Sequence, residues 1–537
     1  MRWSLKGTSS EFISIKEFDN SKCVIIRNNI PETIATETIV LEMYRNYDKA
    51  LIASCDMTIR VVNPNIIMAM DTNPEVLTIL MNHGLAKGEY LLKSDAEAIT
   101  DSDIYVDATN SIFTGSKIIH FEEFEYFTNL TKIPDFCFSG CDRLQIIKMP
   151  ESVKTIGLNA FQNTILTTVY IPRYVQRVDQ KAFSYCKQLT SIVVDNFNST
   201  YCSHGGNLYM GANPEILYMI TPGLTEYIMP EITTSVYSDG SVAWSVGSLL
   251  RKIVLNEKVQ GVSGKWFMYG FSNLTEVTGV ERSDVKYYNG CIYNSDYSKL
   301  IYWPSGKTYS EMDLKYSDSG ECLVREFGER AFSQNKRFTN FTLPSSVTKL
   351  GDWVFYNTSM TSAVVHENVT EIGNYCFSWN GSLQTIDIKT PHLTGINVFA
   401  NCTKLVNVFL ANITSIPNST FHTCSKLTTV DIPETVTSIG DSAFVNSGLV
   451  ELEIPAGVKT IGLECFMGCI RLGDINCLPT IAPSLGKNAF GDSNSNYTGL
   501  RATFKEIHIP SNATGYDSGD WKSILQDKVG FTVYNDL

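Results

Sequence analysis

The residues that could perform acid–base or metal chemistry are few in this chain, and they are widely spaced. Its seven histidines are His83, His120, His204, His366, His392, His422 and His508. None of them forms the HExxH pattern, in which two imidazoles share one helix face and bind zinc. None of the fourteen cysteines belongs to a CxxC pair, a common zinc or redox motif. The sequence therefore predicts neither a metal nor a cofactor.

Two further patterns could suggest catalysis or ion binding. Ser245, in AWSVG (243–247), weakly resembles a nucleophile elbow, but no strand before it and no helix after it is evident. Asp101, Asp103 and Asp107 could attract calcium, yet the D-x-D-x-D-G loop with its terminal glutamate is absent. We expect a loop serine and solvated loop acids, and calcium binding in the N-terminal part stays open. An enzyme would need a site that the sequence does not show, so the chain is predicted to be non-enzymatic.

The elements that would position any functional side chain recur with a fixed period. DIPETVTSIGDSAF (431–444) is followed by the similar EIPAGVKTIGLECF (453–466). A period of this length indicates stacked structural repeats. A phenylalanine marks each repeat in two runs with steps of 22 or 23 residues: Phe138, Phe161 and Phe183, then Phe332, Phe355, Phe377, Phe399, Phe421, Phe444 and Phe466.

Each repeat is predicted to form one short strand followed by a compact turn. Segments such as LTTVDI (427–432) end in alternating apolar and polar residues, which suits a strand with one buried face. Pro433 then removes a backbone donor, and Gly440 and Gly462 are expected to supply permissive backbone in the turn. Ordering a residue costs roughly 1–2 kcal/mol of backbone entropy, which one repeat alone cannot offset. The repeats must therefore stack and cover one another.

The repeat cysteines also follow the period. We expect them to be small buried thiols and not disulfides. Five lie three residues after a repeat phenylalanine and three lie directly before one: Cys141, Cys186, Cys402, Cys424 and Cys469, and Cys137, Cys376 and Cys465.

Stacking would align the outward side chains of the strands in columns about 5 Å apart. Two neighbouring columns are predicted in the later repeats, one of Thr385, Asn407, Thr429 and Glu451, the other of Asp387, Phe409, Asp431 and Glu453. Together they would form an acidic stripe with one exposed aromatic ring, and Tyr170 occupies the equivalent place in an earlier repeat. Exposed aromatics among polar groups favour a binding surface. The alternative is the ordinary polar face that any stacked repeat array turns to solvent.

The repeat landmarks A-F, C-x-x-L and I-P-x-x-V-x-x-I-G resemble the BspA-type leucine-rich repeat. The resemblance covers about residues 121–515, beginning at FEEFEYFTNLTKIPDFCFSGCDRLQIIKMPESVKTIGLNAF. It implies a leucine-rich-repeat solenoid of short stacked strands, an α/β repeat fold, preceded by a small mixed α/β module. It also implies a rigid surface used for adhesion or protein recognition. Such arrays and leaders occur in gut bacteria and their phages.

The expected organisation has six parts. They are a strand-rich module (1–63), a short helical leader (64–118), repeats (119–194), irregular repeats with two hairpin-like insertions or degenerate ordinary repeats (195–322), further repeats (323–505) and a C-terminal cap (506–537). In the leader, Asn73, Pro74 and Gly84 bound a predicted helix, and Ser94 to Glu97 is predicted to form a capping box. Trp521 and Ile524 are expected to close the far end.

Composition narrows the partners and the location. The net charge is −13 and 43% of residues are hydrophobic, so we expect a folded chain that binds neither nucleic acid nor an anionic membrane. The longest apolar runs are too short to span a bilayer, and no export signal is recognisable. We therefore expect a phage virion appendage, assembled in the host cytoplasm, with virion proteins bound by the N-terminal module and a host-surface protein or glycan bound by the repeats. The alternative is a bacterial cell-surface adhesin, and homo-oligomerisation stays open.

Overall fold

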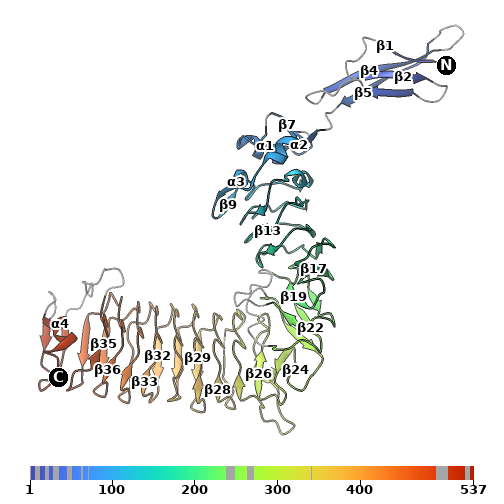
Figure 1. Ribbon diagram of the computed structural model, residues 1–537. Coiled ribbons are helices and arrows are strands. Elements are labelled where there is room, and N and C mark those ends of the chain that lie inside the picture. The colour runs from blue at the N-terminus through green and yellow to red at the C-terminus, as the bar shows by residue number, and fades with distance from the viewer. Residues whose placement is uncertain are drawn as a thin grey trace. The chain divides into compact units, whose positions relative to one another are not determined.

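The computed structural model describes residues 65–537 apart from 71, 87, 238–247, 263–270, 340, 492–505 and 527–531. It describes residues 523–526, residue 532 and five strands before residue 65 by their backbone only. Ser245 and the side chain of Ile524 thus lie outside the described residues. The chain forms two compact units, Met1–Cys202 and Ser203–Leu537. Figure 1 follows the elements along the chain.

The first unit opens with antiparallel strands. β4 pairs with both β1 and β5, and β2 pairs with β3. The five strands are β1 (Arg2–Lys6), β2 (Ile13–Phe18), β3 (Cys23–Arg27), β4 (Ala35–Tyr44) and β5 (Leu51–Val61). The leader that follows consists of β6 (Ile66–Ala69), α1 (Pro74–Asn82), β7 (Tyr90–Leu92), α2 (Lys93–Ala98), α3 (Asp101–Ile104), β8 (Tyr105–Asp107) and β9 (Asn110–Ser111).

The leader corrects two details of the predicted helix ends. Asn73 is the N-cap residue of α1, but its side chain does not cap the helix. Instead its amide donates to the His120 carbonyl at 2.9 Å, which ties the leader to the repeats. The capping box predicted at Ser94 is wrong, because α2 already begins at Lys93. The capping box lies at the next helix, α3, where the Asp103 carboxylate accepts the Thr100 backbone N–H at 2.7 Å.

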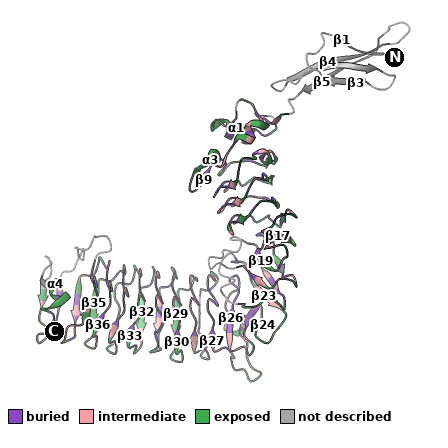
Figure 2. Cartoon of the chain, in the orientation of Figure 1, coloured by how far each residue is buried: buried purple, intermediate pink, exposed green. Residues whose placement is uncertain are grey.

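The repeats form two series of parallel strands. The first series holds the strands that alternate inward and outward, namely β10 (His120–Phe121), β12 (Ile146–Ile147), β14 (Thr168–Ile171) and β16 (Ser191–Val194) in the first unit, and β20 (Glu226–Ile228), β22 (Lys252–Leu255), β23 (Glu276–Gly279), β29 (Ser362–Val365), β31 (Thr385–Ile388), β32 (Asn407–Leu410), β35 (Glu451–Ile454), β37 (Asp474–Cys477), β39 (Glu506–His508) and β40 (Thr532–Tyr534) in the second. Exposed and buried residues alternate most clearly along β14 and β35, and Figure 2 colours the described residues by their burial.

The second series consists of two-residue strands, most of which follow a proline turn. They are β11 (Lys132–Ile133), β13 (Thr155–Ile156), β15 (Arg177–Val178), β21 (Ser235–Val236), β27 (Glu326–Phe327), β28 (Lys349–Leu350), β30 (Glu371–Ile372), β33 (Ser415–Ile416), β34 (Ser438–Ile439), β36 (Thr460–Ile461) and β38 (Ser484–Leu485). One strand of each series in turn makes one rung of the solenoid, and in Figure 1 the rungs of the later repeats lie side by side.

Antiparallel hairpins occur within 195–322. β18 pairs antiparallel with β19, and β25 pairs antiparallel with both β24 and β26. β19 and β26 then pair parallel with the second-series strands β21 and β27, so the hairpins add to that series without ending it. The strands are β17 (Tyr201–His204), β18 (Asn207–Met210), β19 (Ile216–Met219), β24 (Lys286–Tyr288), β25 (Cys291–Tyr293) and β26 (Lys299–Tyr302).

The repeat phenylalanines lie in one internal file within each unit, as predicted. Neighbouring rings from Phe332 to Phe466 are stacked, with centroids 5.1 to 5.6 Å apart. The file is longer than the sequence suggested, because Phe113 stacks on Phe138 and Phe490 stacks on Phe466. Each stacked pair adds roughly 0.5–1.5 kcal/mol beyond burial of its area.

The C-terminal end of the file is closed by an aromatic cap. The helix α4 (Gly519–Gln526) places Trp521 6.1 Å from the Phe490 ring, and its indole N–H donates to the Pro483 carbonyl at 2.7 Å. Trp521 is buried, so its predicted closing role is confirmed.

The repeat glycines have a different role from the predicted one. Neither Gly440 nor Gly462 has a left-handed backbone. A Cβ at Gly462 would lie 2.4 Å from the Asp441 backbone nitrogen of the preceding rung, so glycine is needed for close approach. From Phe332 to Phe466 the left-handed residues are instead those two before and two after each repeat phenylalanine, such as Ser442 and Asn446 around Phe444.

The repeat cysteines are buried free thiols, as predicted. The Cys402 thiol donates to the Phe377 carbonyl of the preceding rung at 3.2 Å, and Cys424 does the same to Phe399. Burial raises the pKa of Cys402 to about 12, so this thiol is protonated and serves as a structural donor.

Candidate functional site

Three neighbouring strands of the second unit carry acidic side chains at matching positions. β35, β37 and β39 are parallel, and the first residues of the three strands, Glu451, Asp474 and Glu506, are register partners. The residues between the outward positions, such as Leu452 and Ile475, are buried in the core. The alternation of the strand thus turns every carboxylate in this column away from the core.

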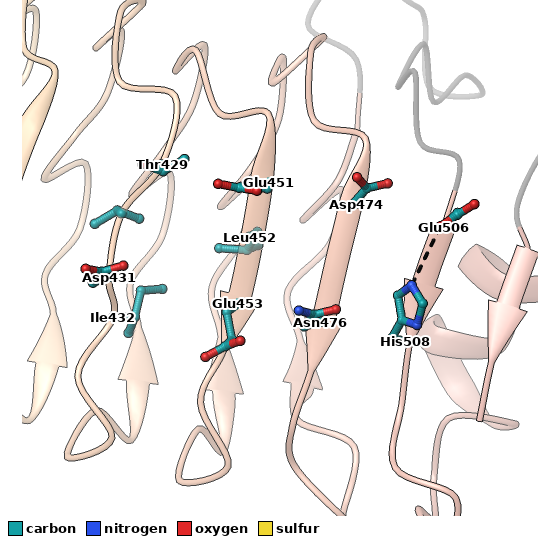
Figure 3. Close-up of a pocket in the computed structure, with 11 residues that line it drawn as sticks. Thr429, Asp431, Ile432, Glu451, Leu452, Glu453, Asp474, Asn476, Glu506 and His508 are labelled. Carbon is teal, nitrogen blue, oxygen red and sulfur yellow. Dashed lines mark ion pairs between the residues drawn. The ribbon is translucent and has the colours of Figure 1, made fainter. Parts of the chain in front are cut away.

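The preceding rung extends this surface without a regular strand. Residues 427–432 are not assigned to a strand, yet the Val450 N–H donates to the Thr428 carbonyl at 2.9 Å. This bond keeps Thr429 beside Glu451 and Asp431 beside Glu453 (Figure 3). Together the four rungs form an open groove of about 560 Å³, which we call the acidic groove, lined by Thr429, Val430, Asp431, Ile432, Glu451, Leu452, Glu453, Asp474, Asn476, Glu506 and His508.

Four of the five carboxylates of the acidic groove have no cationic partner among the described residues. Asp431, Glu451, Glu453 and Asp474 form no ion pair with any residue that the structure describes. Like charges on directly opposite strand positions repel each other. At a strand spacing of about 4.8 Å and a water-like dielectric, the repulsion is on the order of 1 kcal/mol per pair. The groove therefore retains an electrostatic cost.

His508 is the one ionisable base among the groove residues. Its Nδ1 lies 2.8 Å from the Asp536 carboxylate and its Nε2 lies 3.8 Å from Glu506, while its ring stacks on Tyr534. The hydrogen bond to Asp536, with the nearby Glu506 charge, raises the pKa of His508 above its ordinary value of 6.5. The imidazolium is thus already held by Asp536, away from Asp431 and Glu453.

The predicted binding residues fall into three groups. Thr429, Asp431, Glu451 and Glu453 line the acidic groove. Thr385, Asp387, Asn407 and Phe409 lie on the paired strands β31 and β32, where the Asn407 amide donates to the Thr385 hydroxyl at 3.2 Å. Phe409 is 56% exposed and does not line the groove.

Tyr170 forms the third group, in the first unit. Its hydroxyl donates to the Asp195 carboxylate at 2.6 Å, which raises the pKa of Tyr170 to about 12. Nearby, the Arg173 guanidinium lies over the rings of Tyr174 and Phe197. This surface is therefore aromatic and carries a cation, unlike the acidic groove.

The sequence prediction missed the second half of the groove. Asp474, Asn476, Glu506 and His508 continue the two columns by strand pairing. The signal was present, because DINC (474–477) and EIHI (506–509) repeat the alternation of ELEI (451–454). Irregular spacing concealed this signal. The step from Glu451 to Asp474 is one residue longer than the steps between the earlier residues of the same column. Glu506, the next residue of the column, follows an insertion.

The aspartates considered for calcium are engaged in hydrogen bonds of the leader. Asp101 accepts the Thr131 backbone N–H at 2.8 Å, and Asp107 accepts from Thr109 and Asn110. The Thr100 contacts hold the pKa of Asp103 below its ordinary value. Across the described part of the chain, no group of three histidine, cysteine or acidic side chains is arranged to hold a metal ion.

Comparison with solved structures gives distant matches. A leucine-rich repeat protein from Bacteroides ovatus ATCC 8483 is 20% identical over 76% of this chain and 82% of that chain, with a TM-score of 0.34. One from Eubacterium ventriosum ATCC 27560 is 21% identical over 60% and 81%, with a TM-score of 0.32. A leucine rich cell surface protein from Faecalibacterium prausnitzii A2-165 is 18% identical over 74% and 66%, with a TM-score of 0.17.

Curated protein sequences give no match. Among the described helices, none has the length and apolar character that a bilayer span requires. The model of the BspA type leucine rich repeat region matches in six copies, within residues 109–205, 307–411 and 392–513. These ranges cover more than half of the chain and coincide with the stacked rungs and their phenylalanine file. The chain therefore belongs to the BspA type leucine-rich repeat family.

Proposed function

We propose that this protein is a non-enzymatic binding protein whose acidic groove engages a protein segment rich in lysine or arginine. Solenoid repeat proteins use their extended surfaces to bind other molecules. The observation that carries the proposal is the aligned column of Glu451, Asp474 and Glu506, in which no lysine or arginine of the described residues stands between the carboxylates. A cationic partner would offset the repulsion that the folded chain otherwise retains.

The groove suits an extended segment laid across the rungs. Carboxylates stand on both sides of it, from Asp431 and Glu453 to Glu451 and Asp474, with uncharged hydrogen-bonding groups at Thr429 and Asn476. Opposite charges would accelerate the encounter and make the affinity depend on ionic strength.

We further propose that the face of β31 and β32 makes a separate contact with the same partner or with another one. Phe409 is exposed and lies beside Asp387, its register partner, while Asn407 and Thr385 stand in the neighbouring column. Exposed aromatic rings bordered by polar groups are enriched among residues that contribute strongly to binding. Tyr170 would contribute a contact in the first unit.

For the biological setting, we favour an appendage of a bacteriophage particle. In it the N-terminal strand module would attach to virion proteins and the repeats would meet the host surface. The alternative is an adhesin on the bacterial cell surface. What supports display in either setting is an antiparallel strand module followed along the chain by the repeat array. Mass spectrometry of purified particles separates the two, because absence from virions would remove the phage setting.

The groove is tested by removing its charge without changing its shape. We expect the triple variant Glu451→Gln, Glu453→Gln, Asp474→Asn to bind a short fluorescent lysine–serine peptide at least about tenfold more weakly than the native chain does. The matched control Glu367→Gln, Glu434→Gln, Asp517→Asn removes the same charge at exposed positions outside the groove. Fluorescence anisotropy at low and high salt measures both. An equal loss of peptide affinity in the two variants would show that only net charge matters, and it would refute the acidic groove as a defined binding site.

A further inference from the structure

A second surface lies on the turns that hold the phenylalanine file. The residue two positions after each phenylalanine has a left-handed backbone, with φ between 53° and 74° from Gln334 to Gly468. Bulky side chains rarely adopt this conformation, whereas glycine and asparagine adopt it readily. The seven residues are Gln334, Asn357, Trp379, Asn401, Thr423, Asn446 and Gly468. Gln334, Trp379 and Thr423 depart from this preference. The Gln334 side chain accepts a hydrogen bond from Asn357 at 2.9 Å, and the Thr423 hydroxyl lies 2.9 Å from the His422 Nδ1.

Trp379 is the one aromatic residue among these seven. Its φ is 61° and 54% of its surface is exposed. Its indole ring has no ring, cation or hydrogen-bond partner among the described residues. By contrast, Trp353 also has a left-handed backbone, but its ring stacks between the Arg330 guanidinium at 4.3 Å and the Tyr375 ring at 5.0 Å. The Trp353 ring thus contributes contacts within the repeat array, whereas the Trp379 ring faces solvent.

The charge around Trp379 differs from that of the whole chain. The net charge is −13, yet from Ile372 to Val430 the only acidic residue is Asp387, on the strand face. In the same stretch, Lys404 and Lys426 occupy the same repeat position, five residues after successive phenylalanines. Both are exposed, and neither forms an ion pair within the described part of the chain. This turn edge therefore offers free cations in an acidic protein.

These residues lie on consecutive turns. The Trp379 backbone N–H donates to the Ala400 carbonyl at 2.8 Å, and the Asn401 N–H donates to the His422 carbonyl at 2.8 Å. Trp379 and Asn401 are therefore direct neighbours in one column. Lys404 and Lys426 follow on the rungs of Asn401 and His422.

We propose that the edge formed by Trp379, Asn401, Lys404 and Lys426 binds an acidic glycan. A sugar ring stacks its apolar C–H face on the indole, the Asn401 amide bonds a ring hydroxyl, and the lysines pair with a carboxylate or sulfate. A single free ring with two cations suits one saccharide segment. Single-stranded nucleic acid is bound instead by several aromatic platforms along a continuous basic groove.

The full chain is tested by electrophoresis through gels that contain hyaluronan, chondroitin sulfate or uncharged dextran. We expect retardation by at least one of the two acidic glycans and none by dextran. Trp379→Asn should weaken binding about tenfold, as expected for loss of one stacking contact, and so should Lys404→Gln with Lys426→Gln. Lys459→Gln, an exposed lysine outside this edge, should have no effect.

Thermal unfolding separates a binding role from a structural one. Because asparagine suits a left-handed backbone, Trp379→Asn should unfold at the native temperature or above it. A clear fall in that temperature would make Trp379 structural and overturn the proposal. So would a lack of retardation by both acidic glycans, equal retardation by dextran, or tighter binding of oligothymidylate. The groove variant Glu451→Gln, Glu453→Gln, Asp474→Asn should bind the glycan as the native chain does. The test of the glycan site is therefore independent of the test of the acidic groove.

Discussion

Two parallel sheets of the second unit have matching strand registers, but the charges on the first residues of their strands differ. They alternate in sign in one sheet and are all negative in the other. In β20, β22 and β23 the first residues of the strands are register partners and read Glu226, Lys252 and Glu276. In β35, β37 and β39 the corresponding residues all carry carboxylates. Lys252 lies 3.7 Å from one glutamate and 3.6 Å from the other, whereas no described lysine or arginine lies between the carboxylates of the acidic groove.

The difference separates a part of the face whose charges pair within the fold from the part that we propose binds a partner. Lysine–glutamate pairs also link neighbouring rungs at Lys299 with Glu326 and at Lys349 with Glu371. The repeat can therefore accommodate a lysine opposite an acid, and the chain uses this arrangement several times. The repeat architecture therefore does not require a repulsive column, and this is why we propose that the acidic column binds a cationic partner.

The acidic groove depends on close packing of its rungs, and Gly462→Ala is expected to disturb that packing more than any other change proposed here. The added Cβ would lie 2.4 Å from the Asp441 backbone nitrogen, so the rungs below the groove must separate. Overpacking of this kind costs roughly 1–3 kcal/mol. Chemical denaturation should show that loss, together with weaker peptide binding despite unchanged charge.

The control for that change is Gly468→Asn. Gly468 has a left-handed backbone, and asparagine occupies the equivalent position at Asn357, Asn401 and Asn446 with φ between 53° and 62°. We expect its unfolding free energy to stay close to native. Equal losses in the two variants would contradict the distinction between glycines that allow close approach and those that allow a left-handed turn.

The difference between the two sheets is tested directly by exchanging the charges of their middle residues. Asp474→Lys would give the groove the Glu–Lys–Glu order of the earlier sheet, raise its unfolding temperature and abolish most peptide binding. Lys252→Asp would give the earlier sheet an all-acidic column and lower its unfolding temperature. Each change should alter stability by roughly 1 kcal/mol, as expected for exposed pairs. If Asp474→Lys destabilised the chain, the claim that the groove retains a repulsive cost would be wrong.

The sequence predicted the features that depend on the period. The phenylalanine file and the buried thiols could be predicted because the same core positions recur in every rung. Thr429, Asp431, Glu451 and Glu453 were placed correctly in two columns, since side chains alternate along a strand and stack between strands. These predictions needed only local periodicity.

The remaining features depend on three-dimensional neighbours. The role of Gly462 follows from the backbone of another rung, which no local pattern reveals. The capping box could not be placed at Thr100 because Ser94 and Glu97 offer the same motif a few residues earlier. Glu506 and His508 joined the groove across an insertion that breaks the period.

The smallest expected effect concerns pH at the groove's C-terminal end. Because the folded-state pKa of His508 is raised above 6.5, its contact with Asp536 stabilises the fold fully below that value. The contribution is lost as the pH rises through the folded-state pKa. Asp536→Asn should therefore lower the unfolding temperature in mildly acidic solution and change it little in alkaline solution. Glu506→Gln should show the same trend more weakly, because Glu506 lies 3.8 Å from the ring and Asp536 lies 2.8 Å away. A loss of stability for Asp536→Asn that does not vary with pH would show that the contact does not depend on imidazolium charge, and His508 would then leave the groove's charge balance unchanged.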